Sequence, residues 1–399
     1  MRKIQWMPLV CALVIGLSGC IGSPTKSTQP PSDAIQVDGS TYIEEYAPLL
    51  QYQHLTDDEK ICYGQVYTAL RDYGLDETFI HNANGQAYPG LRISITEVEL
   101  AKESLSRVFE AILHDNPQFF YLHRTYSLEG HEIHGQSVYD TLVLQYTMEA
   151  AQRNAAAQEL DSVVTDILNS SPNTDDEYEI ERYLHDRVLE ICSYDDQAAA
   201  SSSQQYADAY SAYGALVKGK AVCEGYAKAM QLVLNRSGIS TTVVLGESVE
   251  DGIAHMWNLV NINGAYYYLD ATWNDNEQQP QYAYFNITTE QLQRTHLIAE
   301  QLYVEICTAQ TDNYYIRNNT YLDSFDRDDI AETIANRIMA GDTTIHLQFG
   351  EGKFENALLF LKNATLTQKM VNSHLSDETM WHYELHIFSD QNIITIKKV

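Results

Sequence analysis

The sequence predicts an α+β protein whose central domain packs a cysteine-bearing helix on an antiparallel sheet that carries histidine and aspartate. Three observations lead to this prediction. The segment GKAVCEGYAKAM, residues 219–230, begins a helical pattern at Cys223, and AHMWNLVNINGAYYYLDATW, residues 254–273, alternates as a β-hairpin around an Asn-Gly turn. A third observation is that helix and strand patterns on both sides are long enough to form two smaller α/β or α+β domains.

The N-terminus has the pattern of an export signal. Two basic residues precede an apolar run, residues 6–17, that is too short to span a bilayer as a permanent helix. The run closes on LSGC, which resembles the lipobox of bacterial lipoproteins, where cleavage precedes a cysteine that is then lipid-modified. We therefore expect a signal peptide at 1–19, lipid attachment at Cys20 and a flexible tether at 20–40, although a generic signal peptide with a chance cysteine is the alternative.

This resemblance implies a place in the cell envelope, on the extracytoplasmic face of a bacterial membrane, with the lipid as the anchor. Whether the cell has one or two membranes stays open. The 25 Lys and Arg residues against 55 Asp and Glu residues give a net charge of −30, which disfavours nucleic acid and anionic lipid surfaces as partners.

The cysteines do not predict a metal site. With Cys20 assigned to lipid, the mature chain keeps Cys62, Cys192, Cys223 and Cys307, which are widely spaced and form no CxxC pattern. Sequence alone gives no disulfide pairing among them. The segment GHEIHG, residues 130–135, lacks the HExxH step and is interpreted as a polar loop. We predict no metal and no cofactor.

Residues 41–170 are predicted to form an N-terminal α+β domain. The segment at 99–117 has a helical stripe of Leu105, Val108, Phe109 and Ile112 and stops before a proline. Residues 138–148 alternate as a strand, and residues 149–169 have the pattern of a long helix that Ser-Ser-Pro-Asn ends.

Residues 171–300 are predicted to form the central domain. A helix at 175–191 is followed by QAAASSSQQYADAYSAYG, residues 197–214, which is interpreted as a loop and the entry to the next element. The next helix starts near Gly219 and runs to Gly238. Cys223 lies in its first turn, where unpaired backbone N–H groups and the helix dipole favour a thiolate and can bind an oxyanion.

Four roles are open to Cys223 on this evidence: nucleophile, metal ligand, disulfide partner or small core residue. Glu224 is adjacent, and it would raise the pKa of the thiol if it were turned toward it.

The hairpin supplies two further groups. With Asn263 and Gly264 as a two-residue turn, Trp257 pairs with Asp270, and His255 and Asp270 become diagonal neighbours about 7–8 Å apart on one face. A slip of one residue would place them on opposite faces. The order Cys, His, Asp suits a triad in which the histidine takes the thiol proton and the carboxylate orients the histidine.

Residues 211–239 and 254–275 resemble the transglutaminase-like core domain, a papain-like cysteine fold found in many exported bacterial proteins, and the resemblance spans roughly residues 175–290. The shared features are the GxxVCxGYA helix start, the HxWNxV strand and the YxxDxTW strand end. The resemblance implies that Cys223 is the nucleophile, His255 the general base and Asp270 the orienting acid.

The same resemblance places Trp257 and Trp273 beside the site, where core packing is the favoured interpretation of both. It also implies a second oxyanion donor from an upstream side chain, for which Tyr194 and Tyr213 are guesses.

The C-terminal part, residues 301–399, is predicted to form a further small α/β domain. Ile330, Ile334 and Ile338 mark a helix that stops at Gly341. The remaining predicted elements are a strand at 343–349, a helix near 355–363, and strands at 382–388 and 393–398. This part carries no motif with recognisable chemistry.

The resemblance implies thioester chemistry on amide bonds, ending in hydrolysis or acyl transfer. We therefore expect an exported, lipid-anchored cysteine enzyme, of transglutaminase or cysteine protease type, that acts on peptides, proteins or cell-wall peptides. The alternative is a non-catalytic binding or scaffolding lipoprotein with a vestigial triad. The substrate, the acyl acceptor and the role of the flanking domains stay open.

Overall fold

The computed structural model describes residues 34–35, 48–81, 84–133, 136–201, 204–276, 280–376 and 382–398. The predicted signal peptide, Cys20 and most of the predicted tether lie outside the described residues. The chain divides into two compact units, the first reaching Asn263 and including Ile298–Glu305, and the second comprising Gly264–Leu297 and the chain from Ile306 onward. The three predicted domain ranges, 41–170, 171–300 and 301–399, stay predictions. In the described part of the chain, no helix has the length and apolar character needed to cross a bilayer.

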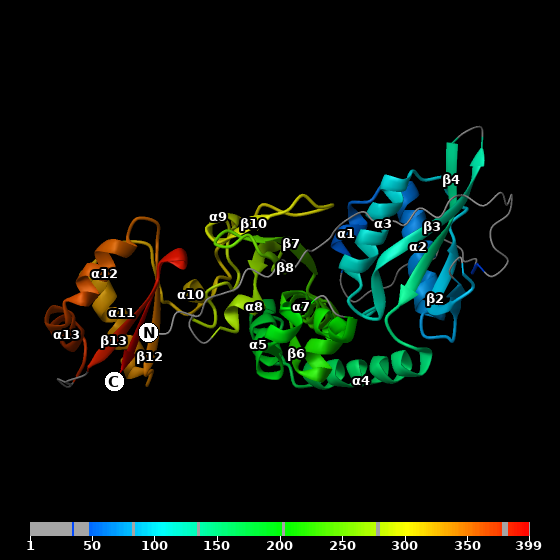
Figure 1. Cartoon of the computed structure of the whole chain (residues 1–399). Coiled ribbons are helices and arrows are strands. Elements are labelled where there is room, and N and C mark those ends of the chain that lie inside the picture. Colours follow the sequence, from blue (N-terminus) through cyan, green and yellow to red (C-terminus); the bar gives the residue numbers. More distant parts are fainter. Residues whose placement is uncertain are drawn as a thin grey trace. The chain divides into compact units, whose positions relative to one another are not determined.

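The first unit begins with a sheet covered by helices. Strands β1, β2, β4 and β3 are neighbours in that order and all pair antiparallel. Helices α2 and α3 pack against the sheet, and their apolar side chains share one core with it (Figure 1). The elements of this part are α1 (Leu50–Gln53), α2 (Asp57–Tyr73), β1 (Phe79–His81), β2 (Ala87–Ser94), α3 (Lys102–Asp115), β3 (Leu122–Ile133) and β4 (Gln136–Tyr146).

Local signals explain where these helices start and which face they bury. Thr56 and Glu59 form a reciprocal capping box at the start of α2. The predicted stripe of α3, from Leu105 to Ile112, is buried in the core as expected.

The rest of the first unit is mainly helical and includes the cysteine-bearing helix. Its elements are α4 (Ala150–Asn169), α5 (Glu177–Ile191), β5 (Ser193–Tyr194), α6 (Asp196–Ala199), the 3₁₀ segment η1 (Gln204–Tyr210), the π-helical turn η2 (Gly214–Lys218), β6 (Lys220–Ala221), α7 (Cys223–Arg236), β7 (Thr241–Ser248) and β8 (Ala254–Ile262). Helix α7 buries Tyr226, Met230, Val233 and Leu234, the predicted apolar face, and β7 and β8 pair antiparallel.

Helices α1 and α3 are joined to β7 and α7 by buried polar contacts within the first unit. The Gln51 side chain donates to the Thr242 hydroxyl at 3.1 Å, and the Gln231 amide nitrogen donates to the His114 carbonyl at 2.5 Å. Buried hydrogen bonds of this kind fix how two parts pack because leaving either group unpaired is costly.

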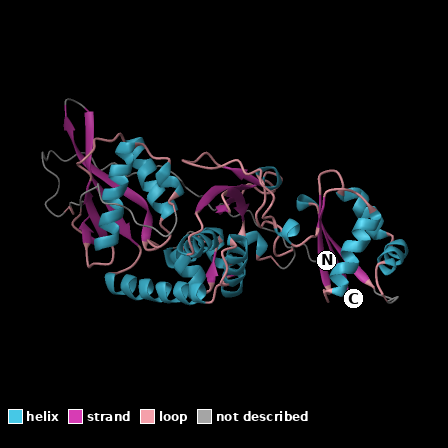
Figure 2. Ribbon diagram, turned by 180° about the vertical axis from the view of Figure 1, so that it is seen from behind, coloured by secondary structure: helices cyan, strands magenta, loops and turns pink. Residues whose placement is uncertain are grey.

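The second unit contains a smaller sheet with three helices. Strand β11 pairs parallel with β12, β12 pairs antiparallel with β14, and β14 pairs antiparallel with β13. Helices α11, α12 and α13 share an apolar core with this sheet (Figure 2). The elements are β9 (Ala265–Leu269), α8 (Ala271–Asn274), α9 (Thr289–Leu292), β10 (His296–Ile298), α10 (Tyr314–Arg317), β11 (Tyr321–Leu322), α11 (Arg327–Met339), β12 (Thr344–Phe349), α12 (Phe354–Lys362), α13 (Ala364–Ser373), β13 (Tyr383–Phe388), η3 (Ser389–Gln391) and β14 (Ile393–Lys398).

The α+β class is confirmed, but two local predictions are wrong. Residues 197–199 and 204–210, predicted as a loop, form parts of the short helical turns α6 and η1, because small side chains and Tyr206 pack with Val222 in a local apolar cluster. Residues 130–133 of the GHEIHG segment, predicted as a loop, form the end of β3, where they pair with β4.

Candidate functional site

Cys223 is the first residue of α7. The residue before it, Val222, has extended backbone angles and provides no side-chain cap, so the first-turn N–H groups of α7 are not satisfied by that residue. The Cys223 side chain is half-buried, forms no disulfide, and packs against Ala227, Val243, Leu245 and Met256. A thiol at a helix start with partial access to solvent has the placement that activates cysteine nucleophiles.

Gly225 allows the chain to pass close to this helix start. A Cβ atom at Gly225 would lie 2.5 Å from the Ala209 carbonyl oxygen and 2.6 Å from the Ala221 Cβ. The same carbonyl of Ala209 accepts the Val222 N–H at 2.9 Å, which holds η1 beside the turn that leads to Cys223. The glycine two residues after the cysteine is therefore required by close packing, a role that the sequence pattern alone did not reveal.

Glu224 is held by two cations. Arg124 of β3 forms an ion pair with one carboxylate oxygen, and Lys228 donates to the other at 2.8 Å. Burial by itself would raise the pKa of Glu224, but the opposing charges of Arg124 and Lys228 outweigh burial and lower that pKa below its ordinary value. Glu224 is therefore a buried, ionised and paired carboxylate.

His255 lies on β8, opposite Gly246 of β7, and its side chain is buried. The centroid of the His255 ring lies 5.8 Å from that of the Trp257 ring. Trp257 is buried, in agreement with its predicted role in core packing. On the same strand, the buried Asn258 side chain donates to the Ala227 carbonyl of α7 at 2.9 Å. This hydrogen bond ties the strand that carries His255 to the helix that carries Cys223, and sequence reasoning missed it.

Asp270 directly follows β9 and caps α8. Its Oδ1 accepts the Trp273 N–H at 3.1 Å, and its Oδ2 lies 3.1 Å from Nε2 of His296. Both side chains of this pair are almost fully buried, at 1% and 0% exposure. Nδ1 of His296 lies 2.8 Å from the Thr295 hydroxyl. His296 was not identified from the sequence, because a single histidine 26 residues downstream of Asp270 carries no pattern that links the two.

Trp273 packs in the same region. Its ring centroid lies 4.3 Å from that of His296 and 5.1 Å from that of Tyr284. This is the aromatic packing expected for Trp273, and it surrounds the Asp270–His296 pair with rings that exclude water.

The two tyrosines considered as oxyanion donors differ. The Tyr213 hydroxyl donates to Glu159 of α4 at 3.0 Å, and its ring stacks on Phe120 at 5.1 Å, so this side chain is committed to packing. Tyr194 is 40% exposed on β5, and its backbone lies opposite Ala221, two residues before Cys223. Tyr194 stays the candidate of the two.

Three other described cysteines are buried and form no disulfide, namely Cys62, Cys192 and Cys307. Burial, with a smaller contribution from Glu59, raises the pKa of Cys62 to about 12. Cys62 is therefore protonated at neutral pH and provides an internal reference for thiol reactivity.

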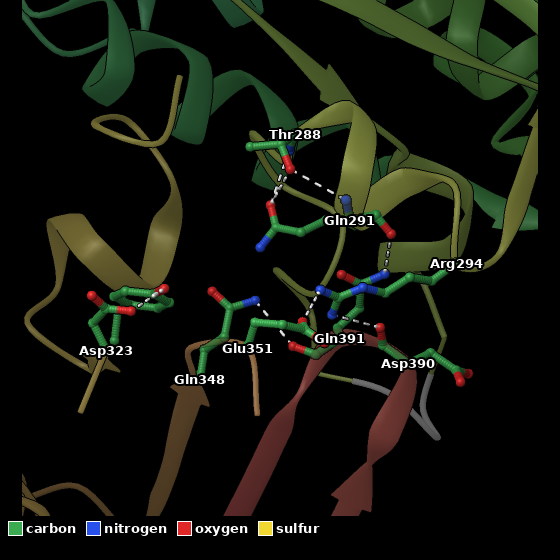
Figure 3. A network of polar contacts seen from close by, with 9 residues as sticks. Thr288, Gln291, Arg294, Asp323, Gln348, Glu351, Asp390 and Gln391 are labelled. Carbon is green, nitrogen blue, oxygen red and sulfur yellow. Dashed lines mark hydrogen bonds and ion pairs between the residues drawn. The ribbon is translucent and has the colours of Figure 1, made fainter. Parts of the chain in front are cut away.

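The second unit contains a polar cavity of about 350 Å³ bordered by α9, β11, η3 and the residues at the end of β12. Figure 3 shows that its side chains largely bind one another or nearby backbone. Arg294 bonds Glu351 at 2.7 Å and the Asp390 carbonyl at 3.3 Å, and Gln391 donates to the Gln291 carbonyl at 3.3 Å. These contacts connect residues 288–294 to Glu351 and to η3, so the polar groups around the cavity have a structural role.

Residues 165–271 match the sequence profile of the transglutaminase-like superfamily. The matched range includes Cys223, His255 and Asp270 and excludes His296. No curated protein is significantly similar to the chain.

Solved structures resemble parts of the chain. One described as a TGase is 18% identical, with a TM-score of 0.27, over 46% of this chain and 51% of that chain. A provisionally assigned cysteine protease from Cytophaga hutchinsonii is 13% identical, with a TM-score of 0.24, over 34% of this chain and 53% of that chain. A provisionally assigned protease from Parabacteroides distasonis is 13% identical, with a TM-score of 0.21, over 35% of this chain and 29% of that chain. The chain thus spans about half the length of the first two structures.

Proposed function

Because the chain carries a transglutaminase-like domain at residues 165–271, we propose that it is a cysteine enzyme that acts on amide bonds of peptides or proteins. The observation that carries this proposal is the placement of Cys223, a half-buried free thiol at the first position of α7. A helix start supplies backbone N–H groups and the positive end of the helix dipole, which stabilise both a thiolate and a developing oxyanion.

The proposed reaction has two stages. His255 takes the thiol proton, and the Cys223 thiolate attacks the amide carbonyl. The tetrahedral intermediate then collapses to a thioester as His255 gives the proton to the departing amine or ammonia. In the second stage, water or another amine attacks the thioester and releases Cys223. Hydrolysis and acyl transfer differ only in that acceptor.

Asp270 is the proposed orienting acid. The predicted register depends on a two-residue turn, and Asn263 and Gly264 have φ values of 54° and 81°, the left-handed angles of a type I′ turn. Asp270 Oδ1 accepts from Trp273, and Oδ2 contacts His296. Because an ionised carboxylate has about four acceptor sites, these two contacts do not by themselves exclude a hydrogen bond from His255.

We extend the proposal to the location of the enzyme. LSGC at residues 17–20 supports lipid attachment at Cys20 and an extracytoplasmic, membrane-anchored protein, with a peptide, protein or cell-wall peptide as substrate. Membrane fractionation of the native chain and of Cys20→Ala tests this part, because recovery of both in the same membrane fraction would refute it.

A non-catalytic binding or scaffolding lipoprotein with a vestigial triad is the second candidate. The observation that favours it is the direct contact of Asp270 with His296, since an Asp270 carboxylate committed to His296 would leave His255 without its orienting partner. Under that reading Cys223 would behave as an ordinary thiol.

Alkylation with iodoacetamide across a pH series, followed by peptide mapping, separates the two candidates. The enzyme proposal predicts that Cys223 is labelled well below the pH at which an ordinary thiol, with a pKa of about 8.5, reacts. Cys62 should stay unlabelled in the folded protein. Reaction of Cys223 only at the pH of an ordinary thiol would refute the enzyme proposal.

A further inference from the structure

Arg124 lies outside the region that matches the transglutaminase-like profile. It belongs to β3 of the N-terminal sheet, and its guanidinium forms an ion pair with Glu224, the residue next to Cys223. The Arg124 side chain is 45% exposed, whereas that of Glu224 is 7% exposed. The guanidinium also lies 4.4 Å from the Tyr210 ring centroid, which fixes its direction.

The charges around Glu224 leave a net positive balance. Glu224 contributes one negative charge, and Arg124 and Lys228 each contribute one positive charge. His114 adds no charge at neutral pH, because burial lowers its pKa to about 4, with Lys228 lowering it further and Glu224 opposing them. If Arg124 were absent, Glu224 and Lys228 would cancel.

The elements around the start of α7 carry other titratable groups that contribute to the pH dependence of this region. They are Arg124 of β3, His114 of α3, Tyr206, Asp208 and Tyr210 of η1, Lys218 of η2, Lys220 of β6, Glu247 of β7 and His255 of β8, besides Glu224 and Lys228 of α7 itself. Of these, Arg124 and Lys228 pair directly with the carboxylate beside Cys223.

We propose that Arg124 is a positioning residue of the thiol site: it binds the Glu224 carboxylate, keeps it turned away from Cys223, and makes the charge beside the thiol positive. This inference rests on the proposed function, because it assigns Arg124 a role only if Cys223 acts as a thiolate. The N-terminal sheet thereby completes a site whose other residues lie within residues 165–271.

The expected effect is a shift in the pH dependence of Cys223 alkylation. Between the dielectric limits of a protein surface and bulk water, removing one nearby unit charge changes a titration midpoint by about 0.5–1 pH unit. Arg124→Gln should therefore raise the pH of half-maximal alkylation of Cys223 by that amount. Arg124→Lys keeps the charge and should restore at least half of the shift, although Lys cannot reproduce the planar contact of Arg with Tyr210.

Three further variants separate this role from a general effect on folding. Arg92→Gln removes an ion pair of the same sheet, with Glu129 at 2.7 Å, and should leave the midpoint unchanged. Glu224→Gln removes the negative charge and should lower the midpoint. Lys228→Gln should raise it, as Arg124→Gln does, because either change removes one of the two positive charges.

The outcomes distinguish the inference from the proposed function. Suppose that the wild type has a low pH of half-maximal Cys223 alkylation. If Arg124→Gln leaves that midpoint unchanged, or if Arg92→Gln shifts it by the same amount as Arg124→Gln, the inference about Arg124 is overturned and the proposed function is not. A wild-type midpoint equal to that of an ordinary thiol overturns both. If Arg124→Gln does not fold, Glu224→Gln decides, since a midpoint that fails to fall would refute the proposed charge balance.

Discussion

Replacing Gly225 with alanine should damage both the stability of the protein and the reactivity of Cys223. The new Cβ would lie 2.5 Å from the Ala209 carbonyl oxygen and 2.6 Å from the Ala221 Cβ. Ordinary contacts are near 3.4 Å or longer, so the backbone of η1 or of α7 must move by roughly 0.9 Å, and overpacking of this kind costs about 1–3 kcal/mol.

A competing effect reduces the expected loss of stability. Alanine is favoured over glycine inside a helix by about 1 kcal/mol, which offsets part of the overpacking cost. We therefore expect the free energy of unfolding to fall by about 0–2 kcal/mol. Reactivity should suffer more, because a displacement of about 1 Å at a reacting group can reduce the rate about 100-fold.

The assay combines urea unfolding with the rate of Cys223 alkylation at neutral pH. The double variant Gly225→Ala with Ala221→Gly removes one of the two close contacts and should recover part of both losses. A Gly225→Ala protein that is more stable than the wild type and fully reactive would refute the packing argument.

Three other predictions concern the contacts around the site. Asn258→Ala removes the donor to the Ala227 carbonyl, so it should lower the free energy of unfolding by about 1–3 kcal/mol and slow Cys223 alkylation, as urea unfolding and peptide mapping would measure. If Asp270 orients His255, His296→Gln should retain at least a tenth of the wild-type activity in amidase assays. Loss of all activity in His296→Gln would instead make the pair of Asp270 and His296 the essential one. A chelator should leave the wild-type activity unchanged. The pKa of Glu224 is lowered in the folded protein, so its ion pairs stabilise the fold at pH values above the ordinary pKa of glutamate. This contribution is lost as the pH falls through the pKa of Glu224 in the folded protein. Urea unfolding of the wild type and of Glu224→Gln across that pH range should show that their free energies of unfolding converge in acid.

Local patterns were enough to predict most of the elements around the site. The apolar stripes of α3 and α7 and the Asn-Gly turn after β8 each follow from neighbouring residues, and the structure has them at the expected positions. The three conspicuous residues of the proposed triad could also be selected, because their spacing resembles a known family.

Long-range partners could not be predicted in the same way. Arg124 meets Glu224 across 100 residues of chain, and no local pattern records that contact. No sequence pattern identifies the partners of His296 and Asn258, and only the packing of the strands shows what they bind. The helical turns at 197–214 were missed because that segment is rich in small and polar residues and has no apolar period.

The most direct test of the proposed enzyme is mass spectrometry of the protein after brief reaction with glutamine-containing peptides, with and without an added alkylamine. The account predicts an acyl adduct on Cys223 in the wild type, none in Cys223→Ala, and formation about 10⁴-fold slower in folded Asp270→Asn, the loss measured for the equivalent change in the serine protease triad. Turnover of an amide substrate by Cys223→Ala at the wild-type rate would contradict the account.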